Sequence, residues 1–291
     1  MTKLIIGCGY LGRRVARRWR AAGHAVTGVV RHEEQARLLE TEGIGAILAD
    51  VTRLETLGQL PPAETVLFSV GFDPAGGQSR RAVYVDGLHA VLDRIPTAAA
   101  VSGDVSRVIL VSSTGVYGEA GGDWVDEDSP CRPTRESGRA LLDAENVLAT
   151  HPLGRVGIVL RLAGLYGPGR LPRTDDLRSG RPLSVSPRQY VNLIHVDDAA
   201  AVVLAAESHA RPPRTYVVSD GRPVDRREYL RRLAEVLDLP SPRYVDDAQG
   251  LTVTTRSEGD KRIRNRRMLE ELGVVLEYPS YWEGLAASIN V

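Results

Sequence analysis

The chain has 291 residues, of which 43% are hydrophobic, and its acidic and basic residues balance to a formal net charge of zero. This composition is ordinary for a soluble globular protein of one large domain or two modest ones, and it carries no global charge that would attract nucleic acid or a membrane. No stretch is long enough to span a bilayer, and no charged-then-apolar leader precedes the first apolar run. Two cysteines without metal-binding spacing suggest free thiols, so we expect a cytoplasmic protein without a metal site.

The first element is a short apolar strand, residues 4–6, that runs directly into the sequence G-x-G-x-x-G and then into a helical pattern at 11–22. Each glycine has a physical role in a dinucleotide-binding turn. Gly7 allows the tight turn, Gly9 lets a pyrophosphate approach bare backbone, and Gly12 lets the helix pack close to the sheet. The phosphates would lie at the helix N-terminus, where free N–H groups and the helix dipole favour negative charge. In this context the motif predicts a dinucleotide site rather than a plain glycine-rich turn.

Strands and helices then alternate along the first half of the chain. Short apolar runs predict strands at 4–6, 25–30, 44–49, 65–70, 107–112 and 156–160, and helical patterns occur at 11–22, 33–42, 82–95 and 137–150. Strict alternation with short links predicts an α/β fold with a Rossmann-type, doubly wound parallel sheet.

The residue composition changes after Leu162, where a loop rich in proline, glycine and arginine extends through Pro187. Helices are predicted at 197–208, 226–237, 265–272 and 281–289, and a strand at 215–219. These elements are too fragmented for a second sheet domain. We therefore expect a dinucleotide-binding domain over 1–165, to which 190–212 returns, and a small C-terminal substrate-binding lobe over 166–189 and 213–291.

The residue at the tip of the second strand indicates which dinucleotide binds. A carboxylate there accepts a hydrogen bond from the ribose 2′-hydroxyl of NAD, whereas an arginine accommodates the 2′-phosphate of NADP. This chain has Arg31, nineteen residues after Gly12, which favours NADP(H) over NAD, although Arg31 at a solvated strand end is the alternative. Arg13 offers a second phosphate donor, and Asp50 suits the adenine edge unless it only forms a turn. The predicted cofactor contacts are Gly7, Gly9, Tyr10, Leu11, Gly12, Arg13, Arg31, Asp50, Val51 and Ser112.

Further segments match in order along most of the chain: V-S-S-T-G-V-Y-G at 111–118, D-E at 126–127, R-L-A-G-L-Y-G-P-G at 161–169 and I-H-V-D-D at 194–198. Together with the glycine loop, they resemble the extended short-chain dehydrogenase/reductase family of the NAD(P)-dependent epimerase/dehydratase type. The resemblance implies a small-molecule substrate and a homodimer formed through helices on the flank of the sheet. It also implies that Ser113 hydrogen-bonds the reacting substrate oxygen.

The family's catalytic pair, Tyr-x-x-x-Lys, is missing from its expected place. With Glu145 as the anchor, the tyrosine position holds Ser137 and the lysine position holds Leu141, and no shift of register restores the pair. The family asparagine on the earlier helix is replaced by Tyr84, and Thr114-Gly115 stand where dehydratases carry Asp-Glu. The chain thus resembles the atypical branch of the extended family.

Other residues could replace the missing catalytic acid or contact the substrate. Tyr84 and Tyr117 are phenols near the predicted strand ends, although a packed core aromatic is the favoured interpretation of Tyr117. Arginines in the loop after the sixth strand, among them Arg161 and Arg170, suggest an anionic substrate such as a nucleotide sugar, or else compositional bias. The loop lacks the interleaved aromatic residues of a nucleic-acid site. His195 is a weak substrate candidate because it precedes Asp197-Asp198 as a helix cap would.

Three hypotheses remain open. The first is an NADP-dependent oxidoreductase or epimerase-like enzyme that uses a non-standard acid on a hydroxyl, carbonyl or sugar-like substrate. The second is a catalytically silent NADP(H)-binding redox sensor or regulator. The third is an enzyme of another reaction type that uses the nucleotide only structurally. Ser113 and the substrate-lobe motifs favour the first hypothesis, since a sensor has less need of a serine at the reacting carbonyl.

Overall fold

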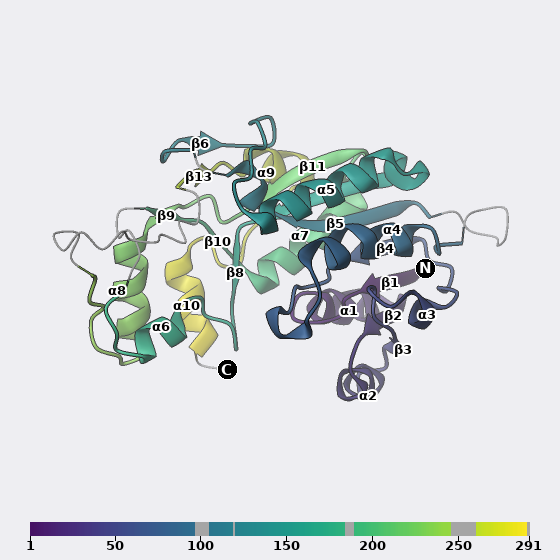
Figure 1. Ribbon diagram of the computed structural model, residues 1–291, viewed down its shortest axis with the longest axis horizontal. Helices are drawn as coiled ribbons and strands as arrows, with labels where there is room; N and C mark the ends of the chain where they lie inside the picture. Colours follow the sequence, from purple (N-terminus) through teal and green to yellow (C-terminus); the bar gives the residue numbers. More distant parts are fainter. Residues whose placement is uncertain (97–104, 119, 184–188, 246–259, 290–291) are drawn as a thin grey trace.

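The central sheet is made of short apolar strands that are buried on both faces, as in other parallel sheets. The computed structural model describes residues 1–96, 105–118, 120–183, 189–245 and 260–289. Within these ranges seven parallel strands pair in the order β11-β7-β5-β4-β1-β2-β3, which confirms the predicted Rossmann-type sheet (Figure 1). The strands are β1 (Thr2–Ile6), β2 (Ala25–Val30), β3 (Gly45–Leu48), β4 (Thr65–Phe68), β5 (Arg107–Ser113), β7 (Gly157–Leu162) and β11 (Arg214–Val218).

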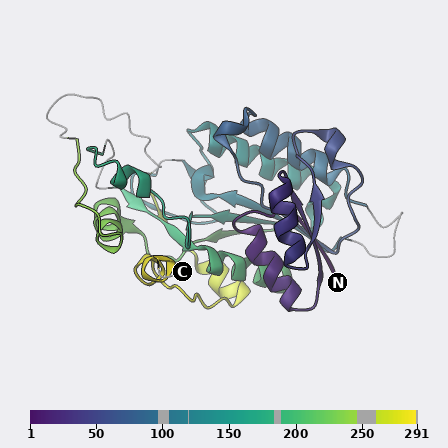
Figure 2. The ribbon, with the colours of Figure 1, turned by 90° about the horizontal axis from the view of Figure 1, so that it is seen from below.

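Helices cover the sheet in a layer on each side (Figure 2). Alternate side chains of β1 show how the two faces are filled, because Ile5 belongs to one apolar cluster and Leu4 and Ile6 to the other. The cluster around Ile5 includes residues of α1 (Gly12–Ala21), α2 (Glu33–Thr41), α7 (Val196–His209) and α9 (Arg266–Leu272). The opposite cluster includes residues of α3 (Leu54–Leu57), α4 (Gly87–Leu92) and α5 (Glu136–Thr150).

The helix predicted over 82–95 is not regular. It opens as a π-helical turn over Ala82–Asp86 and becomes an ordinary α-helix, α4, only from Gly87. Gly87 packs closely against the loop that follows β3, since a Cβ at this position would lie 2.8 Å from the Val51 side chain. π-Turns of this kind frequently occur near functional sites, and this one carries Tyr84.

A smaller lobe lies beyond the carboxyl ends of the strands, where Figure 1 shows α6, α8 and α10 together. Its own apolar cluster includes Tyr166, Leu193, Tyr229 and Leu285. The elements of the lobe are β8 (Gly164–Tyr166), α6 (Thr174–Arg178), β9 (Tyr190–Val191), β10 (Leu193–His195), β12 (Val224–Asp225), α8 (Arg226–Val236) and α10 (Tyr281–Ile289). Short strands β6 (Trp124–Val125) and β13 (Arg262–Ile263) pair with each other, to the left of β11 in Figure 1.

One part of the expected lobe belongs to the sheet instead. The range 213–291 contains β11, which is the edge strand of the central sheet next to β7, and α9, which packs on α7 and β11. The expectation assigned this strand to the lobe because the C-terminal elements are fragmented, and no local pattern indicates that the strand pairs with β7. Among the described residues, no helix is long and apolar enough to cross a membrane.

Candidate functional site

The glycine loop between β1 and α1 forms the floor of a cavity at the carboxyl ends of the strands. Gly7 has φ +84°, and a Cβ there would lie 2.7 Å from the backbone of Val70. Gly12 is equally constrained, because its Cβ would lie 2.7 Å from the Gly7 carbonyl oxygen. Gly9 differs, since no heavy atom lies within 4 Å of its Cβ position. The loop is therefore tight toward the protein and open toward the cavity, which is the shape that a pyrophosphate group requires.

The first cavity has a volume of about 600 Å³ and runs along the ends of β1, β2 and β4. Gly7, Gly9, Tyr10 and Leu11 line it on one side, and Val51 lines it on another. Asp50 is absent from the lining, because its carboxylate accepts hydrogen bonds from the backbone N–H (2.9 Å) and hydroxyl (2.7 Å) of Thr52. Asp50 thus forms a local turn, as the alternative interpretation stated.

The two arginines expected at the 2′-phosphate occupy different places. Arg31 lines the first cavity at the end of β2, where its Nη2 lies 3.5 Å from the Asp73 carboxylate. Arg13 points away from this cavity and, with Arg17, binds Glu42. Hydrogen bonds from Arg17 and then Arg13 lower the pKa of Glu42 to about 2. The structure gives Arg13 an ion pair on the outer face of α1 instead of a position at the cavity.

A second cavity of about 450 Å³ lies at the end of β5 and the start of α5. It shares Leu162, Leu165 and Arg170 with the first cavity, so the two hollows meet at this wall. Ser112 and Ser113 line it from β5, and Ser137 lines it from α5. A ligand in the first cavity and another in the second would therefore touch at the carboxyl end of the sheet.

Ser112 and Ser113 differ in their bonding. The Ser112 hydroxyl is buried and donates to Glu145 Oε1 at 2.6 Å. Ser113 is only half-buried, and its Oγ accepts a bond from the Gly115 N–H at 3.1 Å while it caps the 3-10 turn Thr114–Tyr117. The Ser113 O–H can still donate, so it is the hydroxyl of this pair that can contact a substrate oxygen.

The two phenols considered as substitute acids both lie outside the second cavity. Tyr117 is only 2% exposed and its Oη accepts a hydrogen bond from Arg161 at 2.9 Å. Burial raises the pKa of Tyr117, so the structure corresponds to the packed-aromatic alternative. Tyr84 is half-buried, and its ring lies 6.4 Å from that of Phe72, which lines the first cavity. Burial also raises the pKa of Tyr84, and the residue lines neither of these cavities.

The positions expected for the tyrosine and lysine of the family pair have different environments. Ser137 lines the second cavity together with Ser113, so a side chain at this position does reach the site. Leu141, one turn later, packs on the apolar cluster of Val116, Tyr117 and Ile263. A lysine at 141 would place its charge in that apolar cluster unless it found a partner.

Two of the expected substrate residues have internal partners. Arg161 is buried and binds Glu145 through Nη2 at 2.7 Å, with a further bond to Tyr117. His195 is 1% exposed and accepts from the Asp197 N–H through Nδ1, so it caps α7. Burial lowers the pKa of His195, and its ring packs between Tyr166 and Tyr278. Both residues are therefore structural in their present contacts.

The second cavity also contains residues that the sequence did not single out. Arg135 and Thr134 reach it from the start of α5, Tyr190 and Asn192 from the lobe, and Lys261 from the segment before β13. Lys261 is one of only two lysines in the chain, and that rarity was the one signal available in the sequence. Its Nζ donates to the Gly118 carbonyl oxygen at 3.1 Å across 143 residues of chain.

Metal and thiol chemistry find no support in the described ranges. No group of at least three His, Cys, Asp or Glu side chains there is arranged to hold a metal ion. Cys8 and Cys131 are free thiols, and burial raises the pKa of Cys8 to about 12. Cys8 belongs to the glycine loop itself, and its side chain is buried against Gly28 of β2.

Comparison with known proteins agrees with this geometry. The family model of the NAD-dependent epimerase/dehydratase family matches residues 4–219. Protein YeeZ of Escherichia coli K12 is 28% identical over 283 residues, covering 94% of this chain and 95% of YeeZ. A structure from Methylobacillus flagellatus, provisionally described as an NAD-dependent epimerase/dehydratase, is 33% identical, with a TM-score of 0.77 and coverage of 99% and 97% of the two chains. The dTDP-glucose 4,6-dehydratase DesIV of Streptomyces venezuelae, solved with NAD, shares the fold at 19% identity, with a TM-score of 0.80 and coverage of 100% and 96%.

Proposed function

This chain belongs to the NAD-dependent epimerase/dehydratase family, and we propose that it is an NADP(H)-dependent oxidoreductase acting on a small hydroxyl- or carbonyl-bearing substrate. The observation that carries the proposal is the wall of Leu162, Leu165 and Arg170 shared by the two cavities. A dinucleotide held along the glycine loop would end at this wall, next to a substrate beside Ser113. Ligands of open α/β sheets bind at this carboxyl edge.

In the proposed reaction the protein binds the cofactor, orients the substrate and polarises the substrate oxygen. The Gly7–Gly12 backbone and the N-terminus of α1 would hold the pyrophosphate, and the apolar side chains of Leu162 and Leu165 would exclude water from the nicotinamide. When bound, the nicotinamide supplies or accepts the hydride. The Ser113 hydroxyl donates a hydrogen bond to the substrate oxygen, on which negative charge develops as the carbonyl is reduced. This role needs only the free O–H of Ser113, which the contact with Gly115 leaves available.

The preference for NADP(H) rests on Arg31. Its guanidinium lines the first cavity at the ribose-reading position, and its contact with Asp73 is long and partly exposed. Such pairs are weak, so a 2′-phosphate would compete for Arg31 with little loss. A phosphate would also gain the fork-shaped donor set of the guanidinium.

A catalytically silent NADP(H)-binding protein is the second candidate function. It is favoured by one observation, that Tyr84 and Tyr117 both lie outside the second cavity while Ser137 occupies the expected tyrosine position. Proton transfer would then depend on Ser113, Ser137 or water, which are poorer acids at neutral pH than a tuned phenol.

Hydride transfer by the purified protein tests the proposal. With NADPH and a panel of small ketones and aldehydes, we expect a saturable loss of nicotinamide absorbance with at least one substrate. Ser113→Ala should lower kcat about 100-fold, as for loss of one donor to an oxyanion, and leave the NADPH dissociation constant unchanged. Ser106→Ala, which removes an exposed hydroxyl at the start of the same strand, serves as the control. NADPH binding without turnover of any carbonyl supports the silent function instead.

A further inference from the structure

The lining of the second cavity is strongly cationic. Arg135, Arg170 and Lys261 reach it from α5, from the hairpin after β8, and from the segment before β13. No carboxylate lines this cavity among the described residues. The neighbouring first cavity, by contrast, includes Asp73 beside Arg31. An excess of positive charge in a cavity raises the local concentration of anions.

Arg135 is the cation with the clearest need for a partner. It lies at the N-cap position of α5 and makes no side-chain capping bond. Its Nη2 is covered by protein, and in the described part of the chain no hydrogen-bond acceptor reaches this atom. Leaving a buried donor unsatisfied is unfavourable, and more so when the group is charged. An anion in the cavity would supply the acceptor that the protein lacks.

Two fully buried cations of this chain, Lys3 and Arg161, provide a comparison for the partly buried Arg135. Lys3 binds Glu207, and Arg161 binds Glu145, so each of these charges has a carboxylate partner in the folded protein. Over the same described residues, no ion pair involves Arg135 or Arg170. Arg170 instead lies 5.6 Å from the centre of the Tyr10 ring, at the wall between the two cavities.

Lys261 is held in place through both its side chain and its main chain. The residue is 6% exposed, and its Nζ donates to the carbonyl of Gly118, which ends the 3-10 turn after β5. Its own carbonyl accepts from Asn192 Nδ2 at 2.9 Å, and Asn192 also lines the cavity. The ammonium is therefore positioned before any ligand arrives, which lowers the entropic cost of using it.

We infer that the second cavity binds an anionic group of the substrate, a carboxylate or a phosphate, with Arg135 as its main ligand and Lys261 and Arg170 as supporting charges. The inference rests on the proposed function, because it assigns the substrate class to the same site. Ser113 lines the same cavity of about 450 Å³, so the acidic group and the reacting oxygen belong to one small substrate. The substrate class is thus a short oxo or hydroxy acid, or its phosphate-bearing counterpart.

Ligand binding to the NADP⁺-saturated protein tests this inference, since saturation keeps phosphates out of the first cavity. The probes are a short 2-oxo carboxylate, its uncharged amide, and a phosphate monoester of a short hydroxyketone, each titrated by calorimetry. We expect one or both anions to bind and the amide to bind about tenfold more weakly or worse, as for loss of a charge-assisted bond. Comparison of the carboxylate with the phosphate identifies which acidic group the cavity prefers.

Charge-neutralising variants locate the site. Arg135→Gln should weaken the preferred anion about tenfold or more and leave the amide unaffected, whereas Arg155→Gln, an exposed arginine at the amino edge of the sheet before β7, should change neither. Lys261→Gln provides a second variant if Arg135→Gln does not fold. Equal affinity for carboxylate and amide, no binding of either anion, or unchanged anion affinity in both variants contradicts the inference. NADP⁺ affinity is measured first on the same samples, so a failure of the proposed function shows itself separately as absent cofactor binding.

Discussion

Arg31 is the side chain on which the proposed preference for NADP(H) depends. It occupies the end of β2, and the nearest carboxylate, Asp73, lies 3.5 Å from its Nη2 across the mouth of the first cavity. The same place would receive the ribose 2′-substituent of the dinucleotide. Arg31 and Asp73 therefore act in opposite directions on a 2′-phosphate.

Substitutions at this pair should separate NADPH from NADH. Arg31→Ser removes the phosphate donor, so we expect NADPH affinity to fall about tenfold or more while NADH affinity barely changes. Asp73→Asn removes the competing charge and should strengthen NADPH binding. Arg37→Gln, an exposed arginine on α2 paired with Glu33, is the control for overall charge. Fluorescence titration measures the NADPH and NADH affinities of the wild type and the three variants. An equal loss of affinity for both dinucleotides in Arg31→Ser would contradict the preference for NADP(H).

Asp220 is a second residue whose surroundings govern a measurable property. It follows β11 and is 7% exposed, with Oδ1 accepting from the Arg222 N–H at 2.9 Å. Its Oδ2 has no hydrogen-bond partner among the described residues. Burial raises the pKa of Asp220 to about 7, from an ordinary value of 3.8. The folded protein therefore favours the neutral carboxyl.

The raised pKa predicts a pH-dependent stability. Because the folded state binds the Asp220 proton more tightly than the unfolded chain does, the stabilisation is full below about pH 4 and is lost as the pH rises to about 7. Asp220→Asn stays neutral, so its free energy of unfolding relative to wild type should rise across this range by a total on the order of 2–4 kcal/mol. Urea unfolding at several pH values measures the difference, with the exposed Asp123→Asn as control. A difference that does not vary with pH contradicts the assignment.

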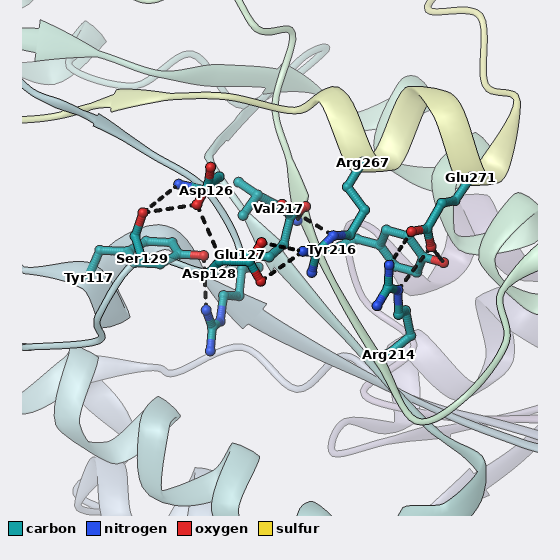
Figure 3. Close-up of polar contacts among 11 residues, drawn as sticks. Tyr117, Asp126, Glu127, Asp128, Ser129, Arg214, Tyr216, Val217, Arg267 and Glu271 are labelled. Atoms are coloured by element: carbon teal, nitrogen blue, oxygen red, sulfur yellow. Dashed lines mark hydrogen bonds and ion pairs between the residues drawn. The ribbon is translucent and has the colours of Figure 1, made fainter.

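At the scale of elements, the edge strand β11 depends on a loop far from it in sequence. Figure 3 shows the 126–129 loop beside β11 and α9, with Glu127 facing the strand. Glu127 Oε1 accepts a hydrogen bond from the Val217 N–H at 2.8 Å, and Arg267 of α9 lies 3.8 Å from Oε2. An edge strand otherwise leaves such N–H groups unpaired and prone to pair with another chain. The Asp-Glu segment of the family resemblance thus has a structural role here.

Removing this carboxylate should loosen β11. Glu127→Ala leaves the Val217 N–H without its acceptor, so we expect a loss of about 1–3 kcal/mol in the free energy of unfolding and faster hydrogen exchange at Val217. Glu127→Gln keeps an acceptor and should cost less. Asp128→Ala is a matched control, because Asp128 is exposed and binds the same Arg267 at 2.7 Å. Stability loss in Asp128→Ala as large as in Glu127→Ala would argue against the edge-strand role.

The sequence predicted the long periodic elements well and the short ones poorly. The strand at Ala25–Val30 and the helix at Tyr281–Ile289 are confirmed residue by residue, because periodicity and flanking breakers mark them locally. The short elements β8 and α6 lie in a region predicted as loop, and β10 lies in a stretch without a predicted element, because their stability comes from packing in the lobe. Two cations of the second cavity, Arg135 and Lys261, were missed as substrate contacts for a similar reason. Lys261 meets Gly118 across 143 residues, and no local pattern encodes that contact.

At the scale of the whole molecule, the lobe and the sheet share one ligand-binding edge. Tyr10 of the glycine loop donates through its hydroxyl to the Pro168 carbonyl at 3.1 Å, and Arg170 of the same hairpin lies on both cavities. The hairpin after β8 therefore contacts the predicted dinucleotide and the predicted substrate together. The expected homodimer concerns a second copy of the chain and stays a prediction.

A crystal structure of the protein with NADP⁺ tests the central claim most directly, that the first cavity delivers a nicotinamide to the substrate cavity at their shared wall. We predict the 2′-phosphate beside Arg31, the pyrophosphate on the Gly7–Gly12 loop, and the nicotinamide ring against Leu162 and Leu165 with its reactive carbon toward Ser113. A nicotinamide ring turned away from Ser113, or a dinucleotide bound outside the first cavity, contradicts the account.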